Sequence, residues 1–290
     1  MNYYNYFNRT YITEMSKRLL FIIILLVFTL LLYFFYTSKE KTSNLRDNID
    51  NEKHDTRASR KDIFYLFPKR TKSQILHYRK FSLAYNEDAE QADWVAYRLY
   101  PNSINNTIKR KNNFRKDYKI ITSSASLEDY KGSGYDRGHL APAKAMSYSK
   151  QSVSESFLMS NMSPQLPLFN RGVWKRLEKQ VRDWISISDS LYVVTGPVLI
   201  SSLPTIGENK VSIPKAYYKA ILRFCKGDIN GIGFLLKHEK SSKKIADFAT
   251  SIDTIEKITG LNFFYLLDSI QQQKVERNNS FHQFVKIKKD

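Results

Sequence analysis

Hydrophobic and polar positions divide this chain into an uncharged N-terminal run, a polar segment and a long region of short apolar stretches. Residues 19–36, with the sequence LLFIIILLVFTLLLYFFY, contain no charged side chain. A helix of this length can cross the hydrocarbon core of a bilayer, so we predict a transmembrane anchor. Residues 1–18 form a short polar tail before it. Residues 37–62 are polar and mixed in charge, which predicts a flexible charged linker.

The end of the apolar run distinguishes an anchor from a cleaved signal peptide. A signal peptide has a shorter apolar region that is followed by small residues at the cleavage site. This run ends in bulky aromatic residues, and Tyr33 and Tyr36 suit the membrane interface, so an uncleaved anchor is favoured. Three basic residues flank the run on each side, and the count of positive charges therefore leaves the orientation open.

Residues 63–270 have the patterns of a folded domain. Apolar, β-rich stretches that end in turn residues predict strands at Trp94–Leu99 and Leu191–Leu199. Two further strands are expected at Ala216–Cys225 and Ile232–Lys237. The turn between these two is assigned to the residues that favour turns, namely Asp228, Asn230 and Gly231.

Helical periodicity appears twice in this domain. Apolar residues at spacings of three and four predict a helix over residues 170–187 with one buried face, and Asn170 stands at its N-terminal end. A second amphipathic helix is expected from Ile245 to Ile258, where Gly260 ends it. Residues 271–290 are predicted to form a polar C-terminal tail. Mixed strands and helices without a regular βαβ repeat indicate an α+β fold.

The charge of the chain is strongly positive. Lys and Arg number 46 against 28 Asp and Glu, which gives a net charge of +18 over 290 residues. Such an excess favours a polyanionic partner, either a nucleic acid or an anionic membrane surface. A lysine-rich composition without any bound partner is the alternative that charge alone leaves open.

Candidate chemistry must come from residues other than cysteine. Cys225 is the only cysteine, so an internal disulfide and a cysteine-based zinc site are excluded. The stretch Gly134–Ala143 instead places a guanidinium, Arg137, close to an imidazole, His139, with glycines on both sides. An imidazole can accept a proton from water near neutral pH, and a guanidinium can bind a phosphate through two parallel hydrogen bonds.

Three motif blocks follow one another in the order and spacing of a known family. They are Asp136-Arg137-Gly138-His139, Ser160-Asn161-x-x-Pro164-Gln165 and Asn170-Arg171-Gly172-x-Trp174-x-x-Leu177-Glu178. With these blocks, most of residues 75–266 resembles the DNA/RNA non-specific endonucleases, the ββα-metal (His-Me finger) nucleases that include mitochondrial endonuclease G. The resemblance implies an α+β fold with a central antiparallel sheet flanked by helices, preceded here by the N-terminal transmembrane helix. It makes residues 63–270 the nuclease domain.

The resemblance also implies roles for the motif residues in hydrolysis of DNA and RNA phosphodiester bonds to products with 5′-phosphate ends. His139 would be the general base, and Asn170 the protein ligand of Mg²⁺, for which Mn²⁺ is a substitute. Glu178 would hold water of the metal's hydration shell, and Arg137 would bind the phosphate. Asn161 would be a polar substrate-side residue. The family's additional phosphate-binding cation is sought among Arg110, Lys111 and Arg115.

One departure from the family pattern opens an alternative function. Ala145 stands where an acidic residue is common, which puts the catalytic rate in doubt. A catalytically weak or inactive surface protein that binds nucleic acid on the same fold is therefore the rival hypothesis.

Expected partners are DNA, RNA and, through residues 19–36, a membrane; a homodimer is also considered. The expected location is a bacterial envelope with the nuclease domain periplasmic or extracellular, and the mitochondrial intermembrane space is the alternative.

Overall fold

The computed structural model describes residues 33, 67–69, 73–104, 108–200 and 202–286. The chain divides into two units, Met1–Ala58 and Ser59–Asp290, and apart from Tyr33 the described residues belong to the second. Among them, no helix combines the length and the apolar character that a membrane crossing requires. The predicted anchor, apart from Tyr33, and the predicted linker at 37–62 lie outside the described residues.

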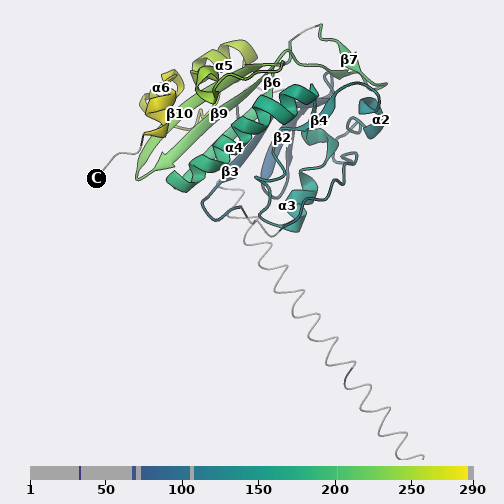
Figure 1. Cartoon of the computed structure of the whole chain (residues 1–290), viewed down its shortest axis with the longest axis horizontal. Helices are drawn as coiled ribbons and strands as arrows, with labels where there is room; N and C mark the ends of the chain where they lie inside the picture. Colours follow the sequence, from purple (N-terminus) through teal and green to yellow (C-terminus); the bar gives the residue numbers. More distant parts are fainter. Residues whose placement is uncertain (1–32, 34–66, 70–72, 105–107, 201, 287–290) are drawn as a thin grey trace, which may run out of the picture. The chain divides into compact units, whose positions relative to one another are not determined.

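A seven-stranded antiparallel sheet forms the centre of the second unit, in the order β1-β2-β3-β6-β9-β10-β11 (Figure 1). This confirms the α+β class and the central antiparallel sheet. The strands of the sheet are β1 (Gln74–His77), β2 (Phe81–Asn86), β3 (Gln91–Leu99), β6 (Ser190–Pro197), β9 (Ala216–Cys225), β10 (Asp228–Lys237) and β11 (Ala249–Thr250). Two short pairs lie outside it, β4 (Asp136–His139) with β5 (Met162–Gln165), and β7 (Thr205–Ile206) with β8 (Val211–Ser212).

Both faces of the central sheet are covered, because successive residues of a strand point to opposite sides. In β3, Val95 and Tyr97 join the core beneath α4 (Lys175–Trp184), whereas Trp94 and Ala96 join the core on the other face. Helices α5 (Ile252–Thr259) and α6 (Ser269–Arg277) pack against that second face. Neither face of β3 meets water, and this explains why its apolar run is continuous.

The predicted helix over 170–187 is present, but it is made of three pieces. A π-helical segment, η3 (Phe169–Trp174), leads into α4, and a 3₁₀ turn, η4 (Ile185–Ile187), ends it. Gly172 departs from helical geometry, with φ −100° and ψ −111°, and marks a bend within η3. The apolar residues that gave the periodicity are buried, and Trp174 and Leu177 have no exposed surface.

Two local predictions were wrong. The turn between β9 and β10 is formed by Lys226 and Gly227, both with positive φ, and Asp228 already pairs with Cys225. The expected helix from Ile245 to Ile258 is interrupted: a 3₁₀ turn, η5 (Ile245–Phe248), and β11 precede α5. The side chain of Ser251 caps α5 by accepting a hydrogen bond from the backbone N–H of Thr254 at 3.1 Å, which starts a new helix there.

The described part of the C-terminal segment also differs from the predicted polar tail. It forms α6 and α7 (Phe281–Val285), and Val275 and Phe284 are buried. The ring of Phe284 lies 5.0 Å from that of Trp184, at the end of α4. Apolar residues too sparse to give a periodic pattern thus attach the last helix to the core beside α4. The remaining helical segments are α2 (Leu127–Tyr130), α3 (Lys150–Glu155) and η2 (Met159–Asn161).

Candidate active site

A pocket of about 580 Å³ lies where the β4–β5 pair meets η3 and α4. Its charged lining is predominantly basic and includes two acidic side chains. The basic residues are Arg110, Arg137, Lys144, Arg171, Lys175 and Arg182, and the acidic ones are Asp136 and Glu178. His139 and Asn170 also line it. The pocket therefore gathers residues from the first and third motif blocks of the sequence, which are far apart in the chain.

The β4–β5 pair presents the first block to the pocket. Asp136 pairs with Gln165 and His139 pairs with Met162 in an antiparallel register. Gly138 is required between them, because a Cβ atom there would lie 2.2 Å from the side chain of Gln165, which is fully buried. The glycine thus permits close packing of the two strands, and His139 and Arg137 keep their positions at the pocket wall.

His139 is an almost completely buried imidazole whose Nε2 has no hydrogen-bond partner among the described residues. The rings of Phe157, at 4.8 Å, and Phe114, at 5.7 Å, flank it. Burial, with a smaller contribution from the charge of Arg110, lowers the pKa of His139 to about 3. The imidazole is therefore neutral near neutral pH, and a neutral ring that lines a pocket can accept a proton.

This depressed pKa gives an expected dependence of stability on pH. A histidine that is harder to protonate in the folded state than in the unfolded state stabilises the fold above about pH 6.5, and this contribution is lost as pH falls toward the folded pKa. We expect the free energy of unfolding to fall by up to about 1.4 kcal/mol per pH unit between about pH 6 and 4 from this group alone. Urea unfolding of the wild type and of His139→Gln will measure it. The slope should decrease in His139→Gln and stay unchanged in His282→Gln, which alters an exposed histidine on α7; equal slopes in all three proteins would refute the expectation.

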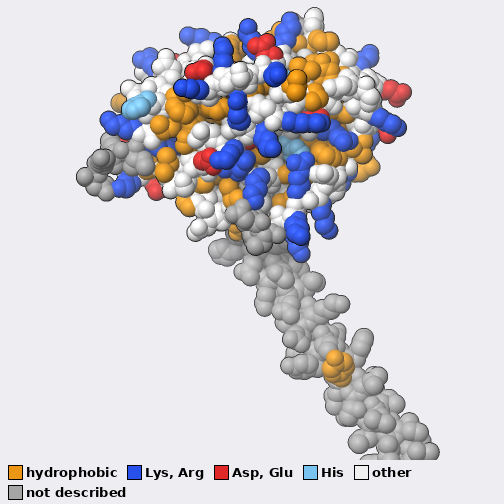
Figure 2. Space-filling model, in the orientation of Figure 1, with side chains coloured by type: hydrophobic (Ala, Val, Ile, Leu, Met, Phe, Trp, Pro, Cys, Tyr) orange, Lys and Arg blue, Asp and Glu red, His pale blue; other side chains and the backbone are white. Residues whose placement is uncertain are grey.

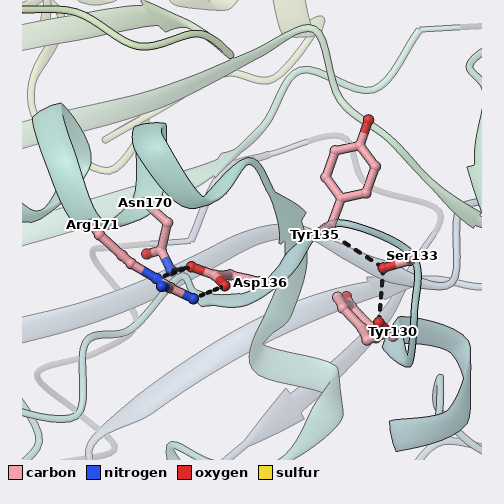
Figure 3. A network of polar contacts seen from close by, with 6 residues as sticks. All are labelled: Tyr130, Ser133, Tyr135, Asp136, Asn170 and Arg171. Atoms are coloured by element: carbon pink, nitrogen blue, oxygen red, sulfur yellow. Dashed lines mark hydrogen bonds and ion pairs between the residues drawn. The ribbon is translucent and has the colours of Figure 1, made fainter.

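Asp136 fixes the orientation of Asn170 (Figure 3). The amide nitrogen of Asn170 donates a hydrogen bond of 2.9 Å to Asp136, and Arg171 binds the same carboxylate through two bonds, of 2.9 and 2.6 Å. Burial disfavours the ionised carboxylate, but these hydrogen bonds outweigh it and hold the pKa of Asp136 below its usual value. Because the amide nitrogen of Asn170 is engaged, its oxygen is left to face a ligand.

The helical geometry around Asn170 differs from the predicted N-terminal cap. Asn170 lies inside η3, where its backbone N–H donates to the carbonyl of Leu166 at 2.9 Å, and its side chain reaches Asp136 rather than a backbone N–H of its own helix. π-helical turns are frequent at functional sites, where they redirect a side chain. Here the wider turn sets Asn170 against the end of β4.

Glu178 lies one helical turn beyond Trp174, on the side of α4 that lines the pocket. Burial raises the pKa of its carboxyl group, and the charges of Lys219, Arg182, Arg110 and Lys175 act against this shift, in that order. The four cations therefore favour the ionised carboxylate of Glu178, whereas burial disfavours its ionisation.

Two of the four arginines that line the pocket lie against aromatic rings. The guanidinium of Arg137 lies 4.4 Å from the ring centre of Phe114, and that of Arg110 lies 5.0 Å from the ring centre of Phe157. These are the same two rings that flank His139. Stacking on a ring face leaves the edges of a guanidinium available for hydrogen bonds to an anion.

Three of the predicted substrate residues do not reach the pocket. Asn161 has no exposed surface, and its amide is used in bonds to the backbone of Ala141 and Ser156, so the prediction that it contacts substrate was wrong. It holds the loop that follows His139. Lys111 is exposed outside the pocket lining, and Arg115 donates a bond of 2.9 Å to the carbonyl of Ser154 at the end of α3. Of the three basic candidates, only Arg110 lines the pocket.

Four cations and one acid of the pocket were not predicted as site residues; the cations are Lys144, Arg171, Lys175 and Arg182, and the acid is Asp136. Lys175 and Arg182 lie three residues before and four residues after Glu178, which is the spacing of one helix face, so this signal was present in the predicted helix. The role of Asp136 as the partner of Asn170 had no signal in the sequence, because the two residues are far apart in the chain and meet only through the fold.

Ala145, the departure from the family pattern, is a core residue. It is buried within the cluster beneath α4 and does not line the pocket, whereas its neighbour Lys144 does. In the described part of the chain, the closest grouping of potential metal-binding side chains is Asp253, Glu256 and Glu276. These residues lie on α5 and α6, on the opposite face of the sheet. They are not part of the pocket.

Positive charge dominates the molecular face that α4 crosses. In the orientation of Figure 1, Lys and Arg side chains are spread over this face and only a few Asp and Glu side chains interrupt them (Figure 2). Lys175 and Arg182 of the pocket lining belong to α4, which crosses this face. A polyanionic backbone would meet complementary charge on its way to His139 and Asn170.

Comparisons with known proteins agree with this geometry. Residues 62–270 match the family described as DNA/RNA non-specific endonuclease. A nuclease of Syncephalastrum racemosum is 33% identical over 220 residues, which cover 68% of this chain and 69% of that protein. Human mitochondrial endonuclease G is 30% identical over 206 residues, covering 66% and 69% of the two chains.

A solved structure is similar over the same region. It is a chain from the crystal structure of an EndoG/EndoGI complex, with a TM-score of 0.67 and 27% identity, covering 72% of this chain and 92% of that one. Sequence, fold and pocket thus point to one family, whose members bind and cleave nucleic acids. The chain belongs to the DNA/RNA non-specific endonuclease family and is a hydrolase that acts on nucleic acids.

Proposed function

We propose that this chain is a divalent-metal-dependent endonuclease that hydrolyses the phosphodiester bonds of both DNA and RNA in the pocket beside α4. The observation on which the proposal rests is the neutral imidazole of His139 in the same pocket as the oriented amide of Asn170. A proton acceptor and an oxygen donor for a cation are the two components that hydrolysis of a phosphodiester requires from this family's site.

The residues of the pocket fit a hydrated Mg²⁺, with Mn²⁺ as a substitute. Asn170 offers an amide oxygen because Asp136 binds its nitrogen, and Glu178 offers a carboxylate in the same pocket. Mg²⁺ prefers oxygen ligands and retains several waters, so one direct protein ligand with help from Glu178 suits it. A bound cation would supply Lewis-acid stabilisation of the charge on the phosphate and on the leaving oxygen.

His139 acts on the attacking water. The imidazole accepts a proton as the water oxygen approaches phosphorus, and the neutral state of the ring makes this possible. An incoming phosphate also places negative charge beside Arg110, whose positive charge contributes to the low pKa of His139. Binding of substrate therefore raises the basicity of the imidazole when the base is needed.

Phosphate recognition falls to Arg137 and Arg110, supported by Lys175 and Arg182 on α4. Contacts to phosphate position a nucleic acid but do not depend on the identity of its bases, which explains a lack of base specificity. The same contacts are available on DNA and RNA. We infer that a single pocket serves both substrates.

Competition between the two substrates tests this inference. With the purified full chain and Mg²⁺, a fluorescently labelled DNA and an unlabelled RNA should compete, and the inhibition constant of the RNA should equal its own KM. Cleavage of one polymer that continues unaffected by saturating amounts of the other would argue against a shared pocket. Tight, salt-sensitive binding without cleavage under any divalent metal would instead favour a binding protein.

We further propose that residues 19–36 hold the nuclease domain at a membrane. The support is their uncharged sequence alone. Two locations keep such a domain away from the genome of its own cell, the outside of a bacterial cytoplasmic membrane and the mitochondrial intermembrane space. Several relatives are named mitochondrial nucleases, among them those of human and yeast. Fractionation of cells or mitochondria, followed by protease treatment with the membrane intact and then broken, decides between the sides; recovery of the full chain in the soluble fraction would contradict the anchor.

A further inference from the structure

Lys219 is a buried lysine in the middle of the central sheet. Its side chain has no exposed surface, although it belongs to a residue type that is almost never fully buried. It lies on β9 between Tyr217 and Ile221, on the face of the sheet that α4 covers. Burial of an ammonium group costs several kcal/mol unless charge or hydrogen bonding compensates it, so the position calls for a physical reason.

The direct contacts of Lys219 are to neutral groups. Its Nζ donates a hydrogen bond of 3.0 Å to Oγ1 of Thr195, on the adjacent strand β6. The same nitrogen lies 4.2 Å from the ring centre of Trp174, at the junction of η3 and α4. Among the described residues no carboxylate forms an ion pair with it. One hydrogen bond and one ring face offset only part of the loss of hydration.

Glu178 lies on the helix that packs over Lys219, and the charges of the two residues act on each other. Trp174 and Glu178 are four residues apart and lie on neighbouring positions of the helical surface. Lys219, beneath Trp174, therefore approaches Glu178 from the core side, whereas Arg182, Arg110 and Lys175 surround it from the pocket side. Lys219 differs from these three cations because it has no exposed surface, and a buried charge is screened less than one at a pocket wall.

We propose that Lys219 is a positioning residue, which holds Glu178 ionised and directed into the pocket so that it can accept hydrogen bonds from the hydration waters of the metal. This inference rests on the proposed function, in which Glu178 has that role. It differs from a purely structural role, in which Lys219 would serve only to pack Trp174. The two roles predict different behaviour when its charge alone is removed.

The ionisation state of the pair supports the proposal. Burial lowers the pKa of Lys219 to about 8, the charge of Glu178 acts against this shift, and that of Arg182 adds to it. Lys219 is therefore protonated at neutral pH. Burial raises the pKa of the Tyr97 hydroxyl, which lies on the same face of the sheet. The charge of Glu178 adds to this shift, and that of Arg182 acts against it. Among the described residues, the titratable groups that face this part of the core are Glu178, Arg182, Tyr97 and Tyr217, together with Arg110 and Lys175 at the pocket wall.

Three variants of the full chain separate charge from packing and hydrogen bonding. Lys219→Met preserves the length of the side chain without its charge, and Lys219→Gln retains a donor for Thr195. Arg223→Met is the matched control, because Arg223 is a second buried cation on the same strand and the same face, and contacts Phe284 and Lys286 at the C-terminal helix. Each is combined with Glu178→Gln in a double-mutant cycle.

The measurement is kcat/KM for DNA cleavage as a function of pH, with urea unfolding of the metal-free proteins beside it. Lys219→Met and Lys219→Gln should both lower kcat/KM at pH 7 on the order of tenfold. Both should move the acidic limb of the profile to higher pH, because loss of a positive charge makes Glu178 harder to ionise. Neither should have any further effect in Glu178→Gln, and Lys219→Met should be no less stable than wild type, since an apolar residue replaces a buried charge. Arg223→Met should keep the wild-type profile.

Each contrary result has a distinct meaning. Additive effects of Lys219→Met and Glu178→Gln, an unshifted acidic limb, or wild-type activity of Lys219→Gln would overturn the positioning role. A loss of activity that only follows a loss of unfolding free energy would assign Lys219 to packing and overturn it as well. Wild-type activity of Glu178→Gln would instead contradict the proposed role of Glu178, and the inference about Lys219 with it.

Discussion

Replacement of His139 by alanine will lower the rate of DNA cleavage by about two to four orders of magnitude, the range typical of a lost general base. In the proposed function this buried, neutral imidazole accepts the proton, and its Nε2 has no hydrogen-bond partner among the described residues. DNA binding should change little, because Arg137 and Arg110 remain on their aromatic supports. Single-turnover cleavage of a labelled duplex, with binding measured by anisotropy in Ca²⁺, gives both quantities.

The control for this variant is His282→Ala, which removes an exposed histidine from α7. It should cleave at the wild-type rate. Removal of the ring also leaves a cavity between Phe114 and Phe157, so unfolding is measured in parallel. A stable His139→Ala protein that cleaves within a factor of three of wild type would show that another group takes the proton.

Replacement of Asn170 by alanine will lower cleavage roughly 100-fold or more and raise the Mg²⁺ concentration needed for half-maximal activity. The variant loses the amide oxygen that Asp136 holds toward the pocket. It also leaves Asp136 with Arg171 as its remaining side-chain partner in the described network. A calorimetric titration with Mn²⁺ alone checks the metal affinity without reference to activity.

Asn209→Ala is a matched control for that experiment. The amide nitrogen of Asn209 likewise donates to a carboxylate, that of Asp129 at 2.8 Å, but both residues lie outside the pocket lining. This variant should keep the wild-type affinity for Mn²⁺ and the wild-type rate. Unchanged Mn²⁺ binding by Asn170→Ala would mean that the cation is held by other residues.

The sequence allowed the sheet and the site helix to be predicted because their residues are buried on well-defined faces. Strand β9 has the predicted bounds, since nearly all of its side chains contact core on one face or the other. The helix from Asn170 to Ile187 was visible through its buried Trp174, Leu177 and Trp184. What periodicity could not reveal is the bend at Gly172, which depends on backbone geometry rather than on the spacing of apolar residues.

The residues of the site were predicted from a resemblance to a family. Such a resemblance is most informative for side chains that have a single chemical role. His139, Asn170, Glu178 and Arg137 are brought together in one pocket. Asn161 shows the limit of this reasoning, because an asparagine in a motif can be required for the loop it holds rather than for substrate. Links across the fold, such as Asp136 to Asn170 or Lys219 to Glu178, have no signature in the local sequence.

The positive charge of the chain also acquires a more specific meaning. From composition, a nucleic acid and a membrane surface were equivalent explanations of a net charge of +18. In the fold, Arg110, Arg137, Lys175 and Arg182 surround a pocket that contains a proton acceptor and an oriented amide. A membrane surface needs no such pocket, so the local arrangement of these cations favours the nucleic acid.

The rate of plasmid cleavage, measured side by side for the wild-type chain and His139→Ala, tests the central claim most directly. Both proteins are purified by the same procedure and incubated with supercoiled plasmid, with Mg²⁺ or with a chelator. The account predicts rapid nicking and degradation by the wild type with Mg²⁺, and only background cleavage by the wild type with chelator or by His139→Ala. The same level of cleavage in the two proteins, or wild-type cleavage that persists with chelator, would contradict a metal-dependent nuclease site at His139.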